Sequence, residues 1–314
     1  MLAVNNMNYL LGIDIGGTKT TVALANKIDA PFAKQTFKTC PENGAKNLVE
    51  RIKNVFESLC LDNKIEKEQV TLAGVACPGP LDVKNGKIIH IATMGFRDVP
   101  IKSMLENALE MPIFLENDAN CAALAESVIG VGKGLDPLVY VTVSTGVGSG
   151  IVVNGKILSG AFSSAGEIGH LTVEPDGAIC PCGKKGCLER YSSGTAIAEL
   201  ASAINNKEIT AKQVFDLARK GDTAMIKIIE EAADKLGLAL SNVYHLIDPQ
   251  VIVLGGSVIN DFDFFEKTLN DALSRYTQPI KERNFNIKIS QFQGEQVLLG
   301  ALIYAKKSAE RIVL

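Results

Sequence analysis

One short segment of the chain concentrates side chains that bind transition metals. Its four potential ligands are His170, Cys180, Cys182 and Cys187. Three thiolates and one imidazole make a closed four-ligand set, which suits structural Zn²⁺ and leaves no open position for catalysis. A disulfide between Cys180 and Cys182 is disfavoured because the two residues are too close in sequence. We therefore predict a structural zinc site, which would fix a loop that also carries Glu167 and Glu189.

Two glycine-rich turns between apolar runs could bind phosphates. The first is Gly16–Lys19, and the second, Ser144–Gly150, repeats the arrangement about 130 residues later. Glycines let backbone amides approach a phosphate, while the Thr hydroxyl and the Lys ammonium can reach its oxygens. Taken alone, the first turn could be an ordinary hairpin turn, and its Gly-Thr-Lys order is not that of a P-loop. The recurrence favours two turns that hold a triphosphate from both sides of a cleft.

A carboxylate inside an apolar run is the next candidate. Asp14 lies within an expected strand, two residues before the first glycine turn. An ionised carboxylate in such a place must be paired or must bind a cation. A Mg²⁺ ion that bridges phosphates would satisfy it. The alternative is a salt bridge to a Lys or Arg elsewhere in the chain.

Asn117 and Asp118 stand where an expected strand gives way to an expected helix. In α/β sheets this position holds residues that handle ligands. Asp118 could accept the proton of a substrate hydroxyl, and the helix dipole would help to keep it ionised. The alternative is that Asp118 is only the N-cap of the helix, a common use of Asp. Spacing alone favours the cap, and the surrounding motifs favour the base.

The elements that must position these residues alternate between strands and helices, which indicates α/β layering. The first half contains an expected strand hairpin and then a helix from Asn43 to Leu61. The second half restarts with a strand, a glycine turn and a strand, which indicates a duplicated unit. We expect a small α/β lobe over residues 1–119, joined by a C-terminal helix over 298–314, and a large lobe with the zinc site over 120–297.

Composition limits the classes of function. A chain of 314 residues that is 46% hydrophobic can form two packed cores. The formal net charge is only -3 and no basic block stands out, so nucleic-acid binding is disfavoured. The first basic residue is Lys19 and no apolar run approaches the length of a membrane span, which predicts a cytoplasmic protein without membrane contact. Seven unevenly spaced cysteines suit reduced thiols and one metal site.

Taken together, these motifs resemble the ROK family of bacterial-type sugar kinases over nearly the whole chain. The matching stretches are LGIDIGGTKT, GVACPGPLD, ENDANCAALAE, VSTGVGSGIVVNGKILSGAFSSAGEIGH and GHLTVEPDGAICPCGKKGCLE. Thr93, Ser144 and Ser149 depart from residues that are common in the family. The resemblance implies the two-lobed, actin-like (ribonuclease H-like) ATPase fold with a cleft between the lobes. It also implies ATP, Mg²⁺ and a structural Zn²⁺ as cofactors, a hexose substrate and a homo-oligomer, either a dimer or a tetramer.

The resemblance also implies a role for each matching residue. Asp118 would be the catalytic base that deprotonates the attacking sugar hydroxyl, and Asp14 would serve Mg²⁺. The residues that would hold the sugar are Asn117, Glu167, His170 and Glu189. The residues that would hold the phosphates are Gly16, Gly17, Thr18, Lys19, Thr145 and Gly146. Gly255 and Gly256 would lie on the adenosine side.

Several functions stay open within and beside this family. The segment MGFRDVPI resembles glucokinases, so glucose is the first substrate expected. N-acetylmannosamine kinases share NCAALAE and the cysteine spacing, which keeps N-acylated hexosamines open, and fructose is a further option. The family also includes sugar-sensing repressors with a DNA-binding domain ahead of the sugar-binding part. Only thirteen residues precede Asp14, which disfavours a repressor. A catalytically inactive sugar-binding module is disfavoured because Asp14, Thr18, Asp118 and Thr145 are all present.

Overall fold

A computed structural model describes residues 8–277 and 284–312. By its internal packing the chain divides into two compact units. Unit 1 runs to Gly130 and adds Lys156–Ala165 and the segment from Phe292, whereas unit 2 contains Val131–Gly155 and Gly166–Gln291. The lobe boundaries expected at residues 119 and 297 stay predictions. Among the described residues, no helix is both long and apolar enough to cross a membrane.

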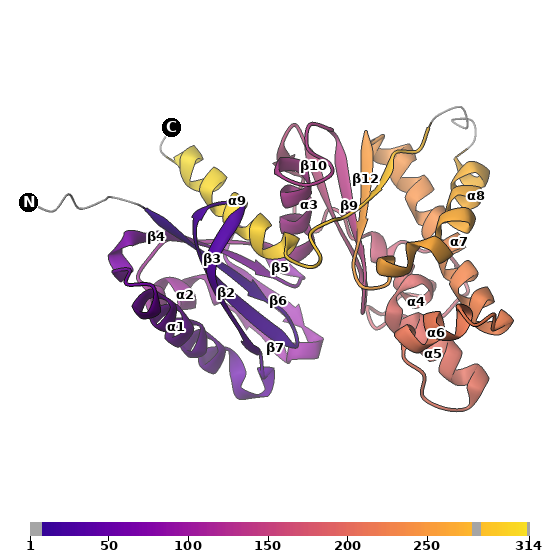
Figure 1. Cartoon of the computed structure of the whole chain (residues 1–314), viewed down its shortest axis with the longest axis horizontal. Coiled ribbons are helices and arrows are strands. Elements are labelled where there is room, and N and C mark those ends of the chain that lie inside the picture. Colours follow the sequence, from indigo (N-terminus) through magenta and orange to yellow (C-terminus); the bar gives the residue numbers. More distant parts are fainter. Residues whose placement is uncertain (1–7, 278–283, 313–314) are drawn as a thin grey trace, which may run out of the picture. The chain divides into compact units, whose positions relative to one another are not determined.

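The main sheet of unit 1 has the strand order β3-β2-β1-β4-β8. Figure 1 labels three of these strands, β2, β3 and β4. Its strands are β1 (Tyr9–Ile15), β2 (Lys19–Lys27), β3 (Ala30–Lys38), β4 (Val70–Cys77) and β8 (Ile113–Asn117). β1 and β2 form the antiparallel hairpin expected around the first glycine turn. β4 runs parallel to both β1 and β8, with Asp14 opposite Ala76 and Cys77 opposite Asn117. The carboxyl ends of these three strands therefore meet at one edge of the sheet.

Helices cover both faces of this sheet. They are α1 (Gly44–Asp62), α2 (Ile101–Leu109), α3 (Asp118–Val128) and α9 (Gln296–Ile312). Successive residues of β1 face opposite sides, so Leu11 joins the core with α1 and α2, whereas Leu10 packs against Leu302 of α9. A glycine in β4 lets α9 approach closely, because a Cβ on Gly74 would lie 2.0 Å from the carbonyl oxygen of Ala301. A smaller sheet in unit 1 contains β5 (Leu81–Asp82), β6 (Lys87–Ile91) and β7 (Phe96–Val99).

The sheet of unit 2 repeats the topology of unit 1. It contains, in order, β10 (Val147–Val153), β9 (Leu138–Val143), β12 (Val251–Gly255) and β13 (Ile287–Ile289). β9 and β10 form an antiparallel hairpin, and β12 runs parallel to both β9 and β13. A short strand, β11 (Lys156–Ile157), follows β10 in the chain. The shared pattern of one hairpin beside two parallel neighbours confirms the predicted duplication at the level of topology.

The helices of unit 2 pack around its longest member, α7 (Thr223–Ile247). The others are α4 (Glu189–Ser192), α5 (Gly194–Asn205), α6 (Ala211–Ala218) and α8 (Glu266–Tyr276). α7 begins after Asp222, whose side chain accepts hydrogen bonds from the amides of Ala224 and Met225. Its buried face contributes Leu236 and Leu240 to the core that the sheet and helices share. Two backbone hydrogen bonds hold α5 and the segment after β12 at the carboxyl end of β9, from Gly194 to Ser144 and from Val258 to Val143.

Most elements expected from the sequence are present, but one strand was not expected and one helix cap differs. The helix expected from Asn43 to Leu61 is α1, which begins at Gly44 and ends at Asp62. The edge strand β3 was not predicted, because most of its residues are exposed and the strand lacks a buried apolar pattern. The expectation that Asp118 is a helix N-cap is wrong, because Asn117 occupies that position and Asp118 is the first residue of α3.

Candidate active site and metal centre

The junction of β8 and α3 presents Asn117 and Asp118 side by side. The Asn117 Oδ1 atom accepts hydrogen bonds from the amides of Ala119, at 2.9 Å, and Asn120, at 3.2 Å. These two bonds satisfy amides that the first turn of a helix leaves without intrahelical partners. The Oδ1 atom of Asp118 also accepts a hydrogen bond from the Ala119 amide, at 2.8 Å. Capping by Asn117 therefore removes the main structural reason for an Asp at position 118.

A buried carboxylate that was not predicted from the sequence, Glu116, accepts hydrogen bonds from two residues of this junction. Glu116 is 1% exposed, and its Oε1 atom accepts hydrogen bonds from the Asn117 amide at 2.8 Å and the Asn120 side chain at 3.0 Å. Burial raises the pKa of Glu116, and these hydrogen bonds oppose that rise. On the other side, a Cβ on Gly79 would lie 3.3 Å from Asn117 Nδ2, so the loop after β4 meets the Asn117 side chain. An acidic residue directly before Asn-Asp was the available sequence signal for Glu116.

Asp14 lies close enough to Asp118 for the two carboxylates to interact. Burial and the negative charge of Asp118 raise the pKa of Asp14 to about 7, and the Lys19 ammonium partly opposes this shift. Burial likewise raises the pKa of Asp118, while hydrogen bonds, first that from the Ala119 amide, lower it. Two carboxylates that disfavour each other's charge attract either a proton or a cation. The pair therefore fits a divalent cation and a proton acceptor placed at neighbouring strand ends.

The β1–β2 turn (Gly16–Thr18) is a tight reversal whose shape depends on its first glycine. The Gly16 amide donates to the carbonyl oxygen of Lys19 at 3.0 Å, and a Cβ on Gly16 would lie 2.8 Å from that oxygen. The carbonyl of Gly16 accepts from Thr39 Oγ1 at 2.6 Å. A Cβ on Gly17 would meet nothing nearer than Thr93 Oγ1, at 4.0 Å. Gly17, Thr18 and Lys19 are exposed, so this turn leaves room for a ligand beside its backbone.

The β9–β10 turn (Ser144–Gly146) is held by its neighbours in unit 2. The carbonyl of Ser144 accepts from the Gly194 amide at 2.7 Å, and the carbonyl of Thr145 accepts from Thr195 Oγ1 at 2.8 Å. Both donors begin α5. Because these bonds occupy carbonyl oxygens, the turn can direct amides and the Thr145 hydroxyl toward an anion.

Gly255 ends β12, and it and the following Gly256 pack tightly against β9. A Cβ on Gly255 would lie 2.5 Å from the hydroxyl of Tyr140. Gly256 has a φ of 96°, and a Cβ there would lie 2.3 Å from the carbonyl oxygen of Val143. Both glycines are thus required by the local packing, which brings the following residue, Ser257, beside Ser144, with their hydroxyls 3.1 Å apart.

The β9–β10 turn and the segment after β12 border a cavity of about 820 Å³ that lies wholly within unit 2. Its lining comes from the β9–β10 turn, α5, α6 with the residues before it, and the segment after β12. The lining residues are Ser144, Thr145, Gly194, Thr195, Ala198, Glu199, Ser202, Glu208, Ile209, Thr210, Ala211, Lys212, Phe215, Ser257, Val258, Asn260 and Asp261. Of these, only Thr145 was a predicted site residue. Ser144 belongs to the same glycine-rich turn, and the others escaped prediction because they come from helices and loops without a motif.

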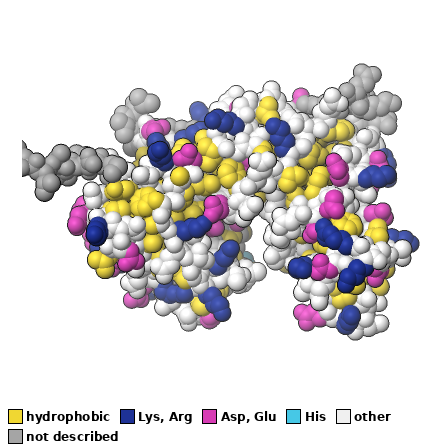
Figure 2. All heavy atoms as spheres, in the orientation of Figure 1, with side chains coloured by type: hydrophobic (Ala, Val, Ile, Leu, Met, Phe, Trp, Pro, Cys, Tyr) yellow, Lys and Arg dark blue, Asp and Glu magenta, His cyan; other side chains and the backbone are white. Residues whose placement is uncertain are grey.

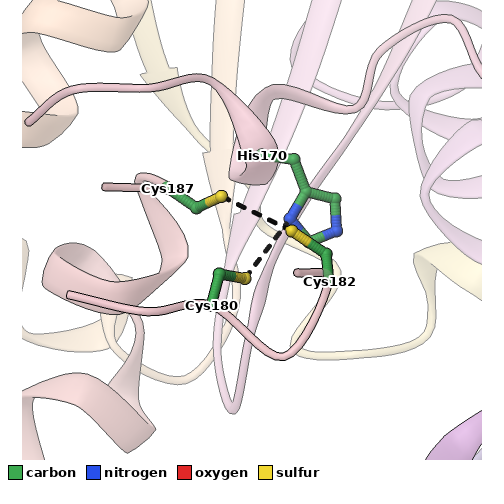
Figure 3. A group of neighbouring side chains, drawn as sticks. All are labelled: His170, Cys180, Cys182 and Cys187. Atoms are coloured by element: carbon green, nitrogen blue, oxygen red, sulfur yellow. Dashed lines mark hydrogen bonds between the residues drawn. The ribbon is translucent and has the colours of Figure 1, made fainter. Parts of the chain in front are cut away.

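The four predicted metal ligands come together in unit 2, with their donor atoms all within 4.8 Å of one another (Figure 3). Cys182 Sγ lies 3.6 Å from Cys187 Sγ, and Cys180 Sγ lies 3.8 Å from His170 Nδ1. Zinc–sulfur bonds of about 2.3 Å at tetrahedral angles separate two sulfurs by about 3.8 Å, so the cluster fits Zn²⁺. The second ring nitrogen of His170 points away from the sulfurs (Figure 3).

The four predicted ligands, His170, Cys180, Cys182 and Cys187, are called the metal cluster below. The polar residues expected beside it, Glu167 and Glu189, lie before His170 and after Cys187 in the chain. Glu167 immediately precedes the short helix η4 (Ile168–His170) and is exposed. Glu189 begins α4 and is half-buried, and its Oε2 atom accepts a hydrogen bond from the Val147 amide at 2.9 Å. The structure therefore brings His170 and Glu189 to the same side of unit 2 as the β9–β10 turn.

Charge is distributed evenly over the surface visible in Figure 2. Lys and Arg side chains are interspersed there with Asp and Glu side chains, in keeping with the formal net charge of -3. A polyanion that approached this face would meet acidic groups beside the basic ones.

Two sheets of one topology, two glycine turns and a strand-end carboxylate define an α/β phosphotransferase. A family model described as the ROK family matches residues 10–308. The chain therefore belongs to the ROK family, and it is a sugar kinase of that family.

Individual relatives support this assignment. The glucokinase of Halalkalibacterium halodurans is 32% identical over 93% of each chain. The N-acetylmannosamine kinase of Yersinia pestis is 32% identical over 95% of this chain and 98% of its own. Among solved structures, the ROK hexokinase of Thermus thermophilus has a TM-score of 0.84 at 31% identity, covering 96% of this chain and 99% of its own. A Streptomyces griseus ROK glucokinase in complex with glucose and AMPPNP has a TM-score of 0.82 at 27% identity, covering 95% and 99%.

These likenesses confirm the predicted fold as well as the family. The protein has the actin-like ATPase fold, in which each half supplies one sheet of the repeated topology. The prediction of a kinase for sugars is likewise confirmed. The relatives include kinases for different sugars at equal identity, so the particular hexose is a separate question.

Proposed function

We propose that this kinase transfers the γ-phosphoryl group of ATP to a hydroxyl of glucose, forming glucose 6-phosphate, with Asp118 as general base. The observation that carries the proposal is the junction of β8 and α3, where Asn117 caps the helix and Asp118 does not have to. A Streptomyces griseus relative binds both glucose and an ATP analogue, which supports the choice of both substrates.

In this mechanism Asp118 accepts the proton of the attacking hydroxyl. The oxygen–hydrogen bond breaks as the hydroxyl oxygen bonds to the γ-phosphorus, and ADP leaves with the electrons of the broken phosphorus–oxygen bond. Its raised pKa makes Asp118 a stronger base than an exposed Asp. Phosphoryl transfer depends mainly on alignment and on neutralisation of charge. Asn117 and the loop at Gly79 support the sugar side of this alignment.

The nucleotide would bind through the two glycine turns and the cavity of unit 2. Gly16, Gly17, Thr18 and Lys19 would contact phosphates in unit 1, and Thr145 and Gly146 would do so in unit 2. The cavity of about 820 Å³ is large enough for a nucleoside, and Thr145 and Ser257 are among its lining residues. Gly255 and Gly256 would then shape the adenosine side. Mg²⁺, held by Asp14, would supply neutralisation of phosphate charge.

The sugar would be held by Asn117, Glu167, His170 and Glu189. Carboxylate and imidazole groups recognise hydroxyls by accepting their hydrogen bonds. The likeness of MGFRDVPI to glucokinases favours glucose. N-acetylmannosamine is the second candidate, because a kinase for that sugar is as similar to this chain as the glucokinase is.

We further propose that His170, Cys180, Cys182 and Cys187 hold one structural Zn²⁺. The tetrahedral spacing of their donor atoms supports this assignment. Coordination through His170 Nδ1 would leave Nε2 to face the sugar. The seven cysteines are free thiols, which suits the reducing cytoplasm. A homo-oligomer, either a dimer or a tetramer, stays a proposal from the family resemblance.

A coupled ADP-release assay with Mg-ATP tests the proposal over glucose, mannose, fructose, N-acetylglucosamine and N-acetylmannosamine. We expect glucose to have the highest kcat/KM. A preference of tenfold or more for N-acetylmannosamine, about 1.4 kcal/mol of transition-state discrimination, would move the assignment to the second candidate. Activity that survives unchanged in Asp118→Asn would instead come from a contaminating kinase or from a different base.

A further inference from the structure

Hydrogen bonds hold the β9–β10 turn on both sides. One of them comes from Glu189, which lies near the predicted metal ligands. The start of α5 holds the carbonyls of Ser144 and Thr145. At the far end, the Val147 amide donates to Glu189 Oε2 at 2.9 Å. A hydrogen bond from an amide to a carboxylate is charge-assisted and roughly twice as strong as a neutral one. Glu189 therefore adds a charge-assisted contact at Val147, the first residue after this turn.

Gly146 provides independent evidence that the Glu189 carboxylate belongs against this turn. A Cβ on Gly146 would lie 2.4 Å from Glu189 Oε2. Any side chain at position 146 would therefore push the carboxylate away from the Val147 amide. The glycine of the turn and the acid of α4 fit each other, which explains the glycine without reference to a ligand.

Two segments next to the predicted metal ligands contact Val147, one at its amide and the other at its carbonyl group. Glu189 follows Cys187 by two residues, and the intervening Leu188 is fully buried. On the opposite side, a Cβ on Gly169, directly before His170, would lie 2.1 Å from the carbonyl oxygen of Val147. The amide and the carbonyl of Val147 are thus each contacted within two residues of a predicted zinc ligand.

Within the segment 170–187, here called the metal loop, the stretch after His170 and the stretch around Cys187 are also hydrogen-bonded to each other. The Leu188 amide donates to the carbonyl of Leu171 at 2.9 Å, and Cys187 pairs with Thr172 in an isolated β-bridge. Ligands on both segments would be drawn to one ion, His170 from the first and Cys187 from the second. Loss of the ion would let the two segments separate, and the hold on Val147 would weaken.

We propose that Glu189 is a positioning residue for the β9–β10 turn, through which the affinity for the nucleotide depends on an intact metal cluster. This inference rests on the proposed function, in which the turn binds phosphates of ATP. The Oε1 atom of the same carboxylate can accept a sugar hydroxyl, so one side chain would connect the sugar, the turn and the metal loop. The role assigned to Glu189 thereby extends beyond sugar binding.

The first test measures the affinity for Mg-ADP by calorimetry, without sugar, in wild type and four variants. Glu189→Ala should lose about tenfold or more, the equivalent of about 1.4 kcal/mol, because the Val147 amide loses its partner. Glu189→Gln should lose about threefold or less, because the amide oxygen still accepts the bond. Glu230→Ala, which removes an exposed acid from α7 in the same unit, should match wild type. Glu189→Asp, which keeps the charge and shortens the reach, should resemble Glu189→Ala and replaces it if that variant does not fold.

The second test repeats these titrations after a chelator has removed zinc. Wild type should lose affinity for Mg-ADP on metal removal, and Glu189→Ala should lose a clearly smaller factor, because the connection is already broken. Equal factors in the two proteins would overturn the dependence on the metal. Wild-type protein that contains no zinc as purified would overturn it as well.

The outcomes separate this inference from the proposed function. Wild type that does not bind Mg-ADP contradicts the proposed function itself. Wild type that binds Mg-ADP, together with Glu189→Ala of equal or higher affinity, overturns the positioning role alone. A loss confined to sugar affinity in Glu189→Ala would likewise assign Glu189 to the sugar and not to the turn.

Discussion

The proposed chemistry depends on two carboxylates, Asp14 near the end of β1 and Asp118 in the first turn of α3. Their surroundings give them different roles. Asp14 is inside a strand, where its pKa rises to about 7. Asp118 lies at a helix start, where burial raises its pKa and hydrogen bonds oppose the rise. Each role can be tested by replacing the carboxylate with an amide of the same shape.

Asp118→Asn should abolish most phosphoryl transfer while it leaves the sugar affinity nearly intact. The amide keeps the volume of the carboxylate but cannot accept the proton, and positioned acid–base groups contribute about 10²–10⁴-fold. Folding should change little because Asn117 is the N-cap. Turnover with Mg-ATP and sugar affinity by calorimetry are measured on one preparation. Asp29→Asn, in the exposed β2–β3 turn, is the control. Near-normal turnover in Asp118→Asn would contradict the base role.

Asp14→Asn should change how stability depends on pH. The folded-state pKa of about 7 lies above the roughly 3.9 of an unfolded chain, so the folded protein binds this proton more tightly. The contribution of Asp14 to the free energy of unfolding therefore falls as pH rises from about 4 to about 7, and stays level above that. Asn does not titrate, so the variant should gain on the order of 2 kcal/mol relative to wild type between pH 5 and pH 8.

Urea denaturation without Mg²⁺ or nucleotide measures this difference. The same pH dependence in both proteins would mean that Asp14 is not perturbed. Added Mg²⁺ should reduce the difference at pH 8, because a bound cation favours the ionised carboxylate.

At the scale of elements, the metal loop lacks regular structure of its own. Between η4 and α4 the backbone forms turns and two isolated bridges, Thr172 with Cys187 and Ile179 with Lys185. Exposed residues such as Ile179, at 71%, bring little apolar burial to this segment. Something other than a hydrophobic core must therefore hold its shape, and the proposed four-ligand metal site would do so.

Purified protein should contain about one zinc per chain, and Cys182→Ser should lower both the zinc content and the melting temperature. Cys182 is the exposed member of the set, so its replacement disturbs packing least. Metal analysis after preparation without chelator checks the first point. Cys60→Ser, in α1 of unit 1, is a control that should keep the zinc. Unchanged zinc content and stability in Cys182→Ser would contradict the proposed metal site.

At the scale of the whole molecule, the two units have sheets of the same topology but contribute different functional features. Unit 1 supplies Asp14 and Asp118 at its strand ends, whereas unit 2 supplies the cavity and the metal cluster. The difference arises after the hairpin of each unit. In unit 2 the metal loop and helices α4 to α6 follow the hairpin, and of these elements α5 and α6 line the cavity within that unit.

Binding of an ATP analogue should therefore protect a defined set of amides from hydrogen exchange. We expect slower exchange in residues 194–212 and 257–261, which line the cavity, and little change in α1 and α2 of unit 1. Mass spectrometry of the exchanged peptides, with and without AMPPNP and Mg²⁺, measures this. Glucose alone should not reproduce the pattern. Protection restricted to the helices of unit 1 would place the nucleotide elsewhere.

The sequence by itself determined the features that depend on local spacing. The β1–β2 hairpin, the helix α1, the duplication and the set of His170 with three cysteines all follow from patterns within short segments. Glycine turns between strands and a metal set within eighteen residues require only local geometry. The resemblance to the ROK family rested on the same segments, which is why family and fold were predictable.

The tertiary structure alone decided the features that depend on residues distant in sequence. Asn117 as the cap could not be separated from Asp118 without backbone geometry, since both residue types cap helices. The edge strand β3 escaped because strand pairing can stabilise a segment without a buried apolar face. The cavity gathers α5, α6 and the residues after β12, and the bond from Val147 to Glu189 spans forty-two positions. Such contacts form when elements pack against each other, and no spacing within one segment encodes them.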